Sequence, residues 1–448
     1  EKTAYIMDKN TDMTAFFGSL PFEMTDAQKK SISDVINDMS TDSPMNRLLQ
    51  GDVGSGKTAV AAAACYFACQ NGFQSALMAP TEILAVQHYN TLKSFLEPIG
   101  VNVVLLTGSM TAKQKRIAKE ALKSGEAAVA AGTHAIIQKD VEFQRLGLVI
   151  TDEQHRFGVA QRAALADKGN SPHRLVMSAT PIPRTLALII YGDLDISIIN
   201  QMPKGRLPVK TYAVTGKLRK RAYNFIKSEI DNGRQAYIVC PMIEDSDSDL
   251  QAVKSYADKL RIDDFADYEI GLLHGKMKAA EKNEIMSKFK DGKIDLLVCT
   301  TVVEVGVDVP NASIMLIENA ERFGLSQLHQ LRGRVGRGSQ QSHCILLTDN
   351  TGEECIRRMK IMSKTSDGFK ISEEDLKMRG PGDFFGQRQH GLPPLKIADI
   401  ASDMEMMNLT KSIAEDIISK DPQLESREYR GLKLEIIRLF NKNGGFAF

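Results

Sequence analysis

The stretch "GDVGSGKT", residues 51–58, decides how the chain around it folds. Its spacing fits the G-x-x-x-x-G-K-[ST] pattern of a loop whose backbone amides hold phosphate groups. The apolar "RLLQ" precedes it and the helix-prone "AVAAAACYF" follows it, which is the strand–loop–helix context that such a loop requires. A glycine turn that ends by chance in Lys-Thr would not need that context. We therefore expect Lys57 to reach the β- and γ-phosphates of ATP and the Thr58 hydroxyl to take a Mg²⁺ position. The expected nucleotide-binding loop consists of Gly51, Asp52, Val53, Gly54, Ser55, Gly56, Lys57 and Thr58.

Short apolar runs alternate with polar, helix-forming sequence on both sides of this loop. The first half contains "QSALMAP", "VNVVLLTG", "AAVAAGT", "LGLVITDE" and "HRLVMSAT", and the second half contains "RQAYIVCP", "YEIGLLHG", "IDLLVCT", "ASIMLIE" and "SHCILLTD". Such runs are typical of buried parallel strands. They pause at "NQMPKGRLPVK", residues 200–210, where proline, glycine and lysine cluster as in a linker. The pattern predicts the α/β class, with two tandem doubly wound domains.

The predicted domain boundaries follow from these breaks. Residues 1–24 are expected to be a leader, 25–203 the first α/β domain, 204–350 the second, and 351–448 a tail. In the tail, "MRGPGDFFGQRQHG", residues 378–391, cannot be a plain helix or strand if its glycines and proline break both. The end of the tail, "SREYRGLKLEIIRLF", predicts an amphipathic helix.

Composition limits the class of protein but not its partner. With 448 residues, 43% of them hydrophobic, the chain is long enough for two or three globular domains. A net charge of +1 neither requires nor excludes nucleic acid, because a basic groove can lie within a balanced total. The six cysteines lie mostly in apolar runs, as buried thiols do in a reducing compartment. Cys65 and Cys69 are spaced for zinc, but a helix interior is favoured because no second pair follows. The sequence has no membrane-spanning apolar run.

Two acids end the run "LGLVITDEQH" at the carboxyl edge of a predicted strand, where ligands of such sheets bind. Asp152 is placed to hold Mg²⁺, and Glu153 to orient or deprotonate the attacking water. A pair of exposed strand-end carboxylates is the alternative interpretation. The second half carries "HQLRGRVGRG", residues 329–338. Arg334 and Arg337 are predicted to face the nucleotide across an interdomain cleft and to neutralise charge on the γ-phosphate, whereas a solvated basic loop is the simpler alternative.

Together these motifs resemble the superfamily 2 helicases and translocases, which have two RecA-like domains. "LPFEMTDAQ" looks like the Q motif, which implies that Gln28 contacts the adenine and that Phe22 stacks beside it. "APTEILAVQH" and "GTHA" look like strand-contacting motifs, and "SAT" like the element that links hydrolysis to nucleic-acid binding, with Ser178 and Thr180 in it. "LLHGKM", "TTVVEVGVDVP" and "QLRGRVGR" resemble motifs IV to VI, which implies nucleotide-site roles for Asp308 and Gln330.

Within that superfamily the chain is most similar to the RecG-type translocases. "TDEQHRFGV" places Gln154 and His155 after the acids, and "RGPGDFFGQRQHG" resembles the TRG motif, which implies that Arg379 and Gln389 transmit the ATP-driven stroke to a helical hairpin and loop. His390 departs from the small hydroxyl residue that is usual there. RecG-type proteins carry an N-terminal wedge domain, and few residues here precede Phe22, so the resemblance implies that this chain is the motor portion of a longer protein.

The resemblance also implies the partners. A motor on DNA needs contacts that hold phosphates without reading bases. The residues that match DNA-contacting positions are Thr81, His88, Gly108, Thr133, His134, His274 and Thr301. Implied partners are double-stranded and branched DNA, such as stalled forks and Holliday junctions, together with single-stranded DNA-binding protein; the implied setting is a cytoplasmic monomer in DNA repair and recombination. The alternatives are a transcription-repair-coupling type of translocase, a nucleotide-gated DNA clamp with little turnover, and an RNA helicase.

Overall fold

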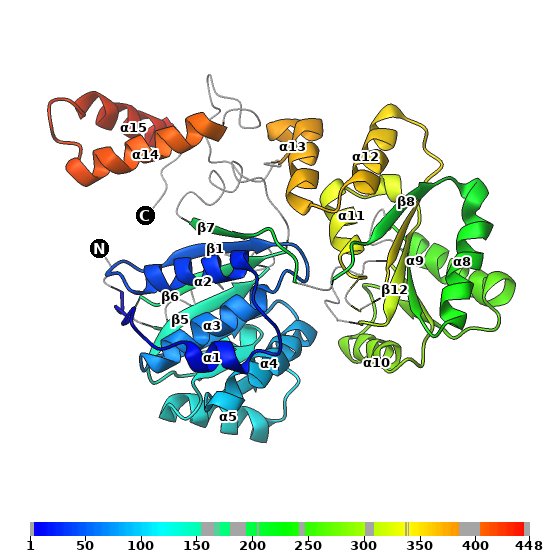
Figure 1. The fold of residues 1–448 in the computed structure, drawn as a ribbon, viewed down its shortest axis with the longest axis horizontal. Coiled ribbons are helices and arrows are strands. Elements are labelled where there is room, and N and C mark those ends of the chain that lie inside the picture. The colour runs from blue at the N-terminus through cyan, green and yellow to red at the C-terminus, as the bar shows by residue number, and fades with distance from the viewer. Residues whose placement is uncertain are drawn as a thin grey trace. The chain divides into compact units, whose positions relative to one another are not determined.

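The computed structural model (Figure 1) describes residues 4–153, 165, 168–169, 171–179, 194–203, 206–241, 247–300, 309–336, 338, 340–384 and 404–442. The chain divides into two compact units. Among the described residues, one unit holds both sheets and ends at Gly368, and the other begins at Phe369. The first unit contains two lobes, each built on one parallel sheet.

The first lobe has a seven-stranded sheet in the order β3-β4-β2-β5-β6-β1-β7, and every neighbouring pair is parallel. Its strands are β1 (Asn46–Gly51), β2 (Gln74–Met78), β3 (Val103–Leu106), β4 (Val129–Gly132), β5 (Leu146–Asp152), β6 (His173–Ser178) and β7 (Asp195–Ile199). The five apolar runs predicted as strands are confirmed. Edge strand β7 was not predicted.

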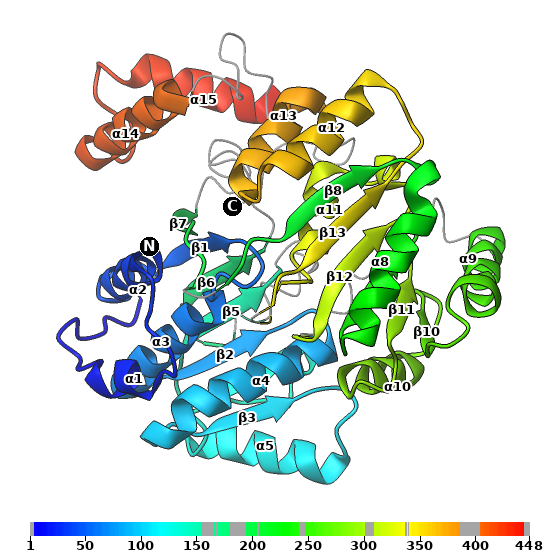
Figure 2. The ribbon, with the colours of Figure 1, turned by 45° about the vertical axis from the view of Figure 1, so that its right-hand side comes forward.

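The second lobe has a six-stranded sheet in the order β10-β11-β9-β12-β13-β8, again with every pair parallel. Its strands are β8 (Lys210–Val214), β9 (Gln235–Val239), β10 (Ile270–Leu273), β11 (Leu296–Cys299), β12 (Ala312–Ile317) and β13 (His343–Leu347). Figure 2 shows β8, β13 and β12 side by side. The two-domain α/β prediction is confirmed, although β8 starts at Lys210, the last residue of the predicted linker.

Helices cover these sheets. The described α-helices of the first lobe are α1 (Thr14–Ser19), α2 (Asp26–Met39), α3 (Lys57–Gln70), α4 (Glu82–Leu96) and α5 (Ala112–Ser124); those of the second are α8 (Arg219–Asp231), α9 (Asp247–Lys259), α10 (Ala279–Lys290), α11 (Leu325–Arg332) and α12 (Glu353–Lys364). On the first sheet, alternate residues face opposite ways. Leu148 and Ile150 join the core with α2 and α3, whereas Val149 joins the core with α5.

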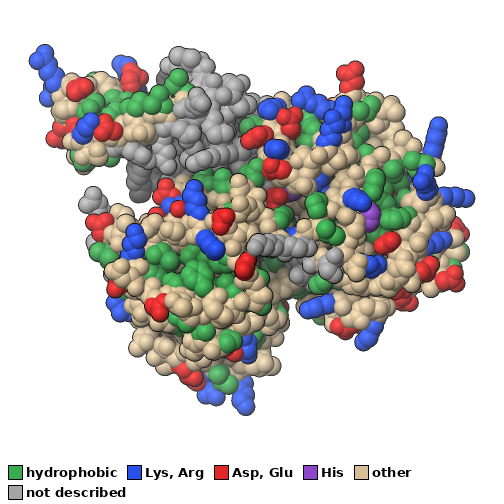
Figure 3. All heavy atoms as spheres, viewed as in Figure 1, with side chains coloured by type: hydrophobic (Ala, Val, Ile, Leu, Met, Phe, Trp, Pro, Cys, Tyr) green, Lys and Arg blue, Asp and Glu red, His purple; other side chains and the backbone are tan. Residues whose placement is uncertain are grey.

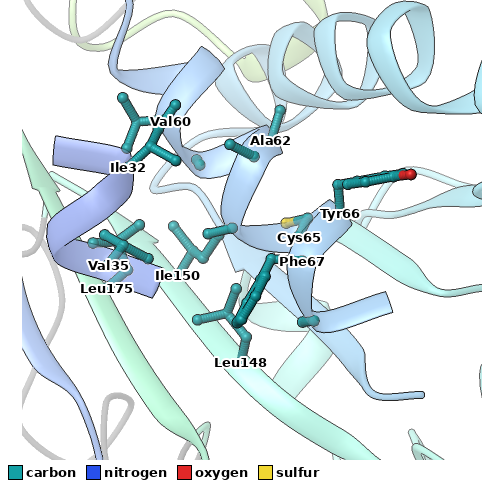
Figure 4. Close-up of a cluster of buried hydrophobic side chains, with 14 of the residues drawn as sticks. Ile32, Val35, Val60, Ala62, Cys65, Tyr66, Phe67, Leu148, Ile150 and Leu175 are labelled. Carbon is teal, nitrogen blue, oxygen red and sulfur yellow. The ribbon is translucent and has the colours of Figure 1, made fainter. Parts of the chain in front are cut away.

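Helix α3 is the centre of the first lobe's larger core (Figure 4). All ten residues from Ala59 to Ala68 are buried, and six of them are alanines, so the helix has no polar face. Phe67 lies beside Leu148 in the close-up. Cys65 belongs to this interior, and burial raises the pKa of its thiol to about 12. The helix predicted from "AVAAAACYF" is therefore confirmed as a core helix.

The tail differs from its prediction in two respects. Helix α12 packs on β8, with Cys355, Met359 and Met362 buried, so the first compact unit continues to Gly368 rather than stopping near residue 350. Helix α13 (Gly368–Phe384) then runs through Gly380 and Pro381, into the stretch that was predicted to break regular structure. That prediction was wrong for residues 378–384. Proline fixes φ near the helical value, and its missing amide removes only one hydrogen bond here, close to the helix end.

The second unit also contains α14 (Met404–Lys420) and α15 (Arg430–Lys442), the latter confirming the amphipathic helix expected at the end of the sequence. Among the helices of the described residues, each is too short or too polar to cross a bilayer. On the face of the molecule drawn in Figure 3, acidic and basic side chains are interspersed. This mixture agrees with the net charge of +1.

Candidate functional site

The glycine loop joins the end of β1 to the start of α3, as the sequence predicted. Gly54 and Gly56 have φ angles of +79° and +87°, in the left-handed region that favours glycine. The turn therefore brings the first amides of α3 to the carboxyl edge of the sheet, where the helix dipole favours an anion. Lys57 Nζ donates to Gly51 O at 2.7 Å and to Asp52 O at 3.0 Å. Its ammonium group is thus held at the mouth of the loop.

Two acids lie at the same edge, at the end of β5. The Asp152 side chain is buried, and its Oδ2 lies 2.8 Å from His88 Nε2. Burial raises the pKa of Asp152, but the His88 hydrogen bond and the charge of Lys57 outweigh it, so the pKa lies below its usual value. Asp152 is therefore an ionised carboxylate beside the loop lysine.

Glu153 occupies a strained backbone position, with φ at +51°. Its Oε1 accepts a hydrogen bond from Ala179 N at 3.3 Å, directly after Ser178 at the end of β6. Burial and the neighbouring Asp152 raise the pKa of Glu153, and the charges of Lys57 and Arg334 offset this only in part. A glutamate with a raised pKa is suited to accept a proton near neutral pH.

The arginine-containing loop of the second lobe lies beside the glycine loop. His329 Nε2, on α11, is 3.0 Å from Asp52 Oδ1, and Gly333 lies so close to Val53 that a Cβ at position 333 would be in tight contact with the Val53 side chain. Arg334 is half-buried and close enough to lower the pKa of Glu153. Burial raises the pKa of Asp52, but His329, the Gly368 amide and Lys57 hold it below its usual value. Gln330 is also half-buried on α11, and its role at the nucleotide site stays a prediction.

Arg206, which sequence reasoning missed, links the same two loops. Its Nη1 donates to Val53 O at 2.9 Å, and its Nε donates to Gly336 O at 2.8 Å. Its guanidinium fills the space that a side chain at Gly54 would need. The only sequence signal was its place in the proline- and glycine-containing linker, which indicates a turn but no partner.

The residues of the suggested adenine site take different positions. Gln28 is buried; its Nε2 donates to Ser55 O at 2.8 Å, and its Oε1 accepts from Thr25 N at 2.9 Å. Gln28 thus ties the start of α2 to the phosphate-binding loop. Phe22 is 41% exposed and packs edge-on against Phe95. Contact of either residue with a base stays a prediction.

Most of the suggested DNA-contacting residues follow β2, β3 and β4, which are neighbours in the sheet. Thr81 caps α4 by accepting Leu84 N at 3.3 Å, Gly108 and His134 are exposed, and Thr133 is only 2% exposed. Within the described residues, the Thr133 hydroxyl makes no hydrogen bond. These positions form the outer half of the carboxyl edge, beside the half that carries the acids.

Two suggested DNA contacts lie elsewhere. His274 follows β10 in the second lobe, where burial and the charges of Lys254 and Lys282 lower its pKa. His88 is buried, with its ring on Asp152 instead of on the surface. The structure therefore brings His88 to the acids rather than to the exposed part of the edge.

Several suggested residues cannot be placed. Arg379 lies on α13, but its side chain is outside the described part. The residues that lie outside the described ranges altogether are Gln154, His155, Thr180, Thr301, Asp308, Arg337 and Gln389.

The donor chemistry around the loop suits Mg²⁺. The Thr58 hydroxyl follows Lys57 in the first turn of α3, and Asp152 supplies carboxylate oxygens; hard oxygen ligands of this kind are those that Mg²⁺ prefers. Within the described residues there is no group of three or more His, Cys, Asp or Glu side chains that could hold a metal by themselves. A phosphate-associated Mg²⁺ needs only one or two protein ligands, because waters and phosphates complete its shell.

Comparison with known proteins gives a consistent result along the chain. Family models match at residues 25–189 (DEAD/DEAH box helicase), 218–339 (helicase conserved C-terminal domain) and 365–444 (ATP-dependent DNA helicase RecG, domain 3, C-terminal). The chain is 50% identical over 430 residues to the ATP-dependent DNA helicase RecG of Bacillus subtilis, covering 96% of this chain and 63% of the relative. It is 49% identical over 428 residues to that of Synechocystis sp., covering 95% and 51%. The chain thus spans a little over half the length of these curated relatives.

Solved structures agree. A structure of RecG bound to a three-way DNA junction matches with a TM-score of 0.77 and 44% identity, over 91% of this chain and 53% of that one. The DUF1998 helicase MrfA bound to DNA matches with a TM-score of 0.58 at 17% identity, over 84% of this chain and 58% of that one, which shows a shared fold alone.

Proposed function

Because the chain belongs to the RecG-type helicases of superfamily 2, we propose that it is the ATP-driven motor of a double-stranded DNA translocase that remodels branched DNA. The observation that carries this proposal is the convergence of Lys57, Asp152 and Glu153 at one sheet edge, with Arg334 from the second lobe close to Glu153. Phosphoryl transfer needs this set: cations that stabilise the phosphate charge, and a carboxylate that orients water.

Each residue has a distinct role in this proposal. The loop amides and Lys57 bind the β- and γ-phosphates, Thr58 and Asp152 hold Mg²⁺, and Glu153 accepts the proton of the attacking water. Mg²⁺, when bound, neutralises phosphate charge. Arg334, together with Arg337, stabilises the charge that develops on the γ-phosphate. Since Arg334 belongs to the other lobe, hydrolysis depends on how the two lobes meet.

A buried polar relay supports transmission of the ATP cycle to the tail. Asp52 contacts His329, whose Nδ1 lies 2.9 Å from Arg332 Nη2. Arg332 Nη1 donates to Met362 O at 2.9 Å and to Thr365 O at 2.8 Å, just before α13 begins. Arg332 is only 3% exposed, so its contacts are shielded from water and strong. The relay runs from the nucleotide loop to the residues just before α13, the helix on which Arg379 lies. Arg379 and Gln389 are proposed to act beyond its end.

The proposed DNA substrates are stalled replication forks and Holliday junctions. Duplex phosphates are proposed to contact the outer half of the first lobe's edge, near Thr81, Gly108 and His134, with His274 and Thr301 contributing from the second lobe. Single-stranded DNA-binding protein is a proposed partner, and a monomer is the proposed functional form.

The test is ATP turnover by this chain with no nucleic acid, blunt duplex, single-stranded DNA or RNA. Duplex is expected to stimulate turnover most, and Lys57→Ala to abolish it, whereas the exposed Lys30→Ala is the matched control and keeps it. Turnover that survives Lys57→Ala would contradict the site. Stronger stimulation by RNA would favour the RNA helicase, and duplex binding without turnover would favour the clamp.

A second assay addresses the tail. Arg379→Ala is expected to preserve turnover but to abolish displacement of a third strand from a triplex. Equal loss of both activities would place Arg379 in the ATPase site rather than in the transmission of the stroke.

A further inference from the structure

His88 connects two parts of the first lobe that otherwise have different roles. It lies in the second turn of α4, a helix that packs on α3, β3 and β4 and starts beside Thr81. Its Nε2 reaches Asp152 Oδ2 at 2.8 Å, and both side chains are about one-tenth exposed, at 10% and 11%. The pair is therefore shielded from solvent and joins two residues 64 apart in the sequence.

We propose that His88 is a positioning residue for Asp152, whose ring N–H fixes one carboxylate oxygen so that the other stays directed to the Mg²⁺ and phosphate position. This inference rests on the proposed ATPase function. It also assigns a route by which α4, whose first turn adjoins the candidate DNA contacts, acts on the nucleotide site. A shift of α4 moves His88, and His88 moves the carboxylate.

The geometry favours this role over a direct contact with DNA. A buried carboxylate needs a donor, because burial without one carries a large desolvation penalty. The His88 ring supplies that donor, and with a side chain only 10% exposed it has little surface left for a phosphate. Residues that hydrogen-bond a metal ligand fix its orientation, and their loss typically lowers metal affinity by about 10- to 100-fold.

The primary measurement is the affinity of a fluorescent ADP analogue with and without Mg²⁺, without any turnover. His88→Ala is expected to lower the Mg²⁺-dependent gain in affinity by about tenfold or more and to leave the Mg²⁺-free affinity unchanged. His88→Gln retains an N–H donor of similar reach and is expected to restore much of the gain. Asn90→Ala, exposed on the same helix, is the matched control and keeps the unaltered behaviour.

A parallel measurement separates the two roles of His88. Binding of blunt duplex in the absence of nucleotide is expected to be the same in His88→Ala and in the unaltered protein. Weaker duplex binding with an intact Mg²⁺-dependent gain would overturn the proposal and make His88 a DNA contact. Equal losses in His88→Ala and His88→Gln, with both folded, would also overturn it, because the donor would then be irrelevant.

Folding and the parent hypothesis are checked separately. If circular dichroism shows that His88→Ala is unfolded, His88→Asn takes its place, because the shorter Asn side chain holds its amide donor farther from Asp152. A reduced Mg²⁺-dependent gain in affinity in His88→Asn supports the positioning role, and an unchanged gain overturns it. If the unaltered chain shows no Mg²⁺-dependent nucleotide binding at all, the proposed function itself fails. If the unaltered chain shows Mg²⁺-dependent nucleotide binding and the His88 variants show the same gain, only the positioning role fails.

Discussion

The two lobes share one strand order but use the same edge differently. Strands β3-β4-β2-β5-β6-β1 of the first sheet correspond one for one to β10-β11-β9-β12-β13-β8 of the second. In the first lobe a loop leads from β1 into α3, and in the second lobe a loop leads from the corresponding strand β8 into α8. In each lobe a glutamate also follows a second corresponding strand, β5 or β12. These glutamates are Glu153 after β5 and Glu318 after β12.

The difference lies in what the charged groups contact. In the second lobe, Arg219 at the start of α8 donates to Glu318 Oε1 at 2.6 Å, and Tyr256 donates to the same oxygen at 2.7 Å. The loop amide of Gly216 is taken by Asp349 Oδ1 at 2.6 Å. In the first lobe, Lys57 Nζ donates to the loop carbonyls of Gly51 and Asp52, and its charge lowers the pKa of Asp152 and of Glu153. The shared topology therefore places a loop and a helix N-terminus at the carboxyl edge of both sheets, where an anion can bind. The local side chains decide whether an anion can reach that position.

The largest effect is expected from Glu153→Gln. Loss of the proton acceptor should lower ATP turnover by about 10²- to 10⁴-fold while nucleotide binding persists. The corresponding Glu318→Gln in the second lobe should leave turnover of the same order, because Glu318 is engaged in an internal ion pair. Steady-state turnover and nucleotide affinity of both variants check this. Comparable losses of turnover in the two variants would abolish the distinction between the lobes.

A smaller effect is expected on stability from Arg219→Ala. The Glu318 side chain is 5% exposed, so removal of its cation leaves a buried carboxylate whose remaining contacts include the Tyr223 and Tyr256 hydroxyls. Breaking a buried pair costs about 3–5 kcal/mol, and the 34% exposure of Arg219 should reduce this to about 2 kcal/mol in the free energy of unfolding. Urea denaturation measures it. The double variant Arg219→Met with Glu318→Gln should recover much of the loss, and equal loss in the single and double variants would refute the ion-pair explanation.

The smallest effect is a pH dependence that separates two corresponding histidines, His173 at the start of β6 and His343 at the start of β13. His173 is fully buried; its Nδ1 accepts from Met45 N at 3.0 Å, and its Nε2 lies 2.8 Å from Tyr5 O. Burial lowers the pKa of both histidines. His173 is fully buried, whereas His343 is only half-buried.

With the folded pKa of His173 below its ordinary value of 6.5, the unfolded chain binds more protons at acidic pH. The contribution of neutral His173 to the free energy of unfolding is therefore complete above about pH 6.5. It declines as the pH falls, by at most about 1.4 kcal/mol per pH unit. Urea unfolding at pH 7.5 and 5.5 checks this. His173→Gln, which keeps one acceptor and one donor, should reduce the pH dependence more than His343→Gln does, and an unchanged dependence would contradict the assignment.

Much of this comparison could be anticipated from the sequence, because it depends on local patterns. The apolar runs gave ten strands, and parallel strands bring their carboxyl ends to one edge, so Lys57, Asp152 and Glu153 were predicted together. The sequence could not show that His88 contacts Asp152 or that Arg206 contacts Val53 and Gly336. Those contacts depend on how side chains far apart in the sequence meet, and no periodicity encodes that. The helix through Gly380 and Pro381 was missed because propensity is a weak rule near a helix end.

The buried part of helix α3, Ala59–Ala68, has a mechanical consequence. Six of its ten consecutive buried residues are alanines, which have no rotamers to change and so cannot absorb a displacement by rearranging. Close-packed interiors have low compressibility and transmit strain. The helix is therefore rigid. Its first residue, Lys57, ends the glycine loop, and its length is packed against the sheet. A force on the loop is passed to the whole lobe instead of being lost in the core.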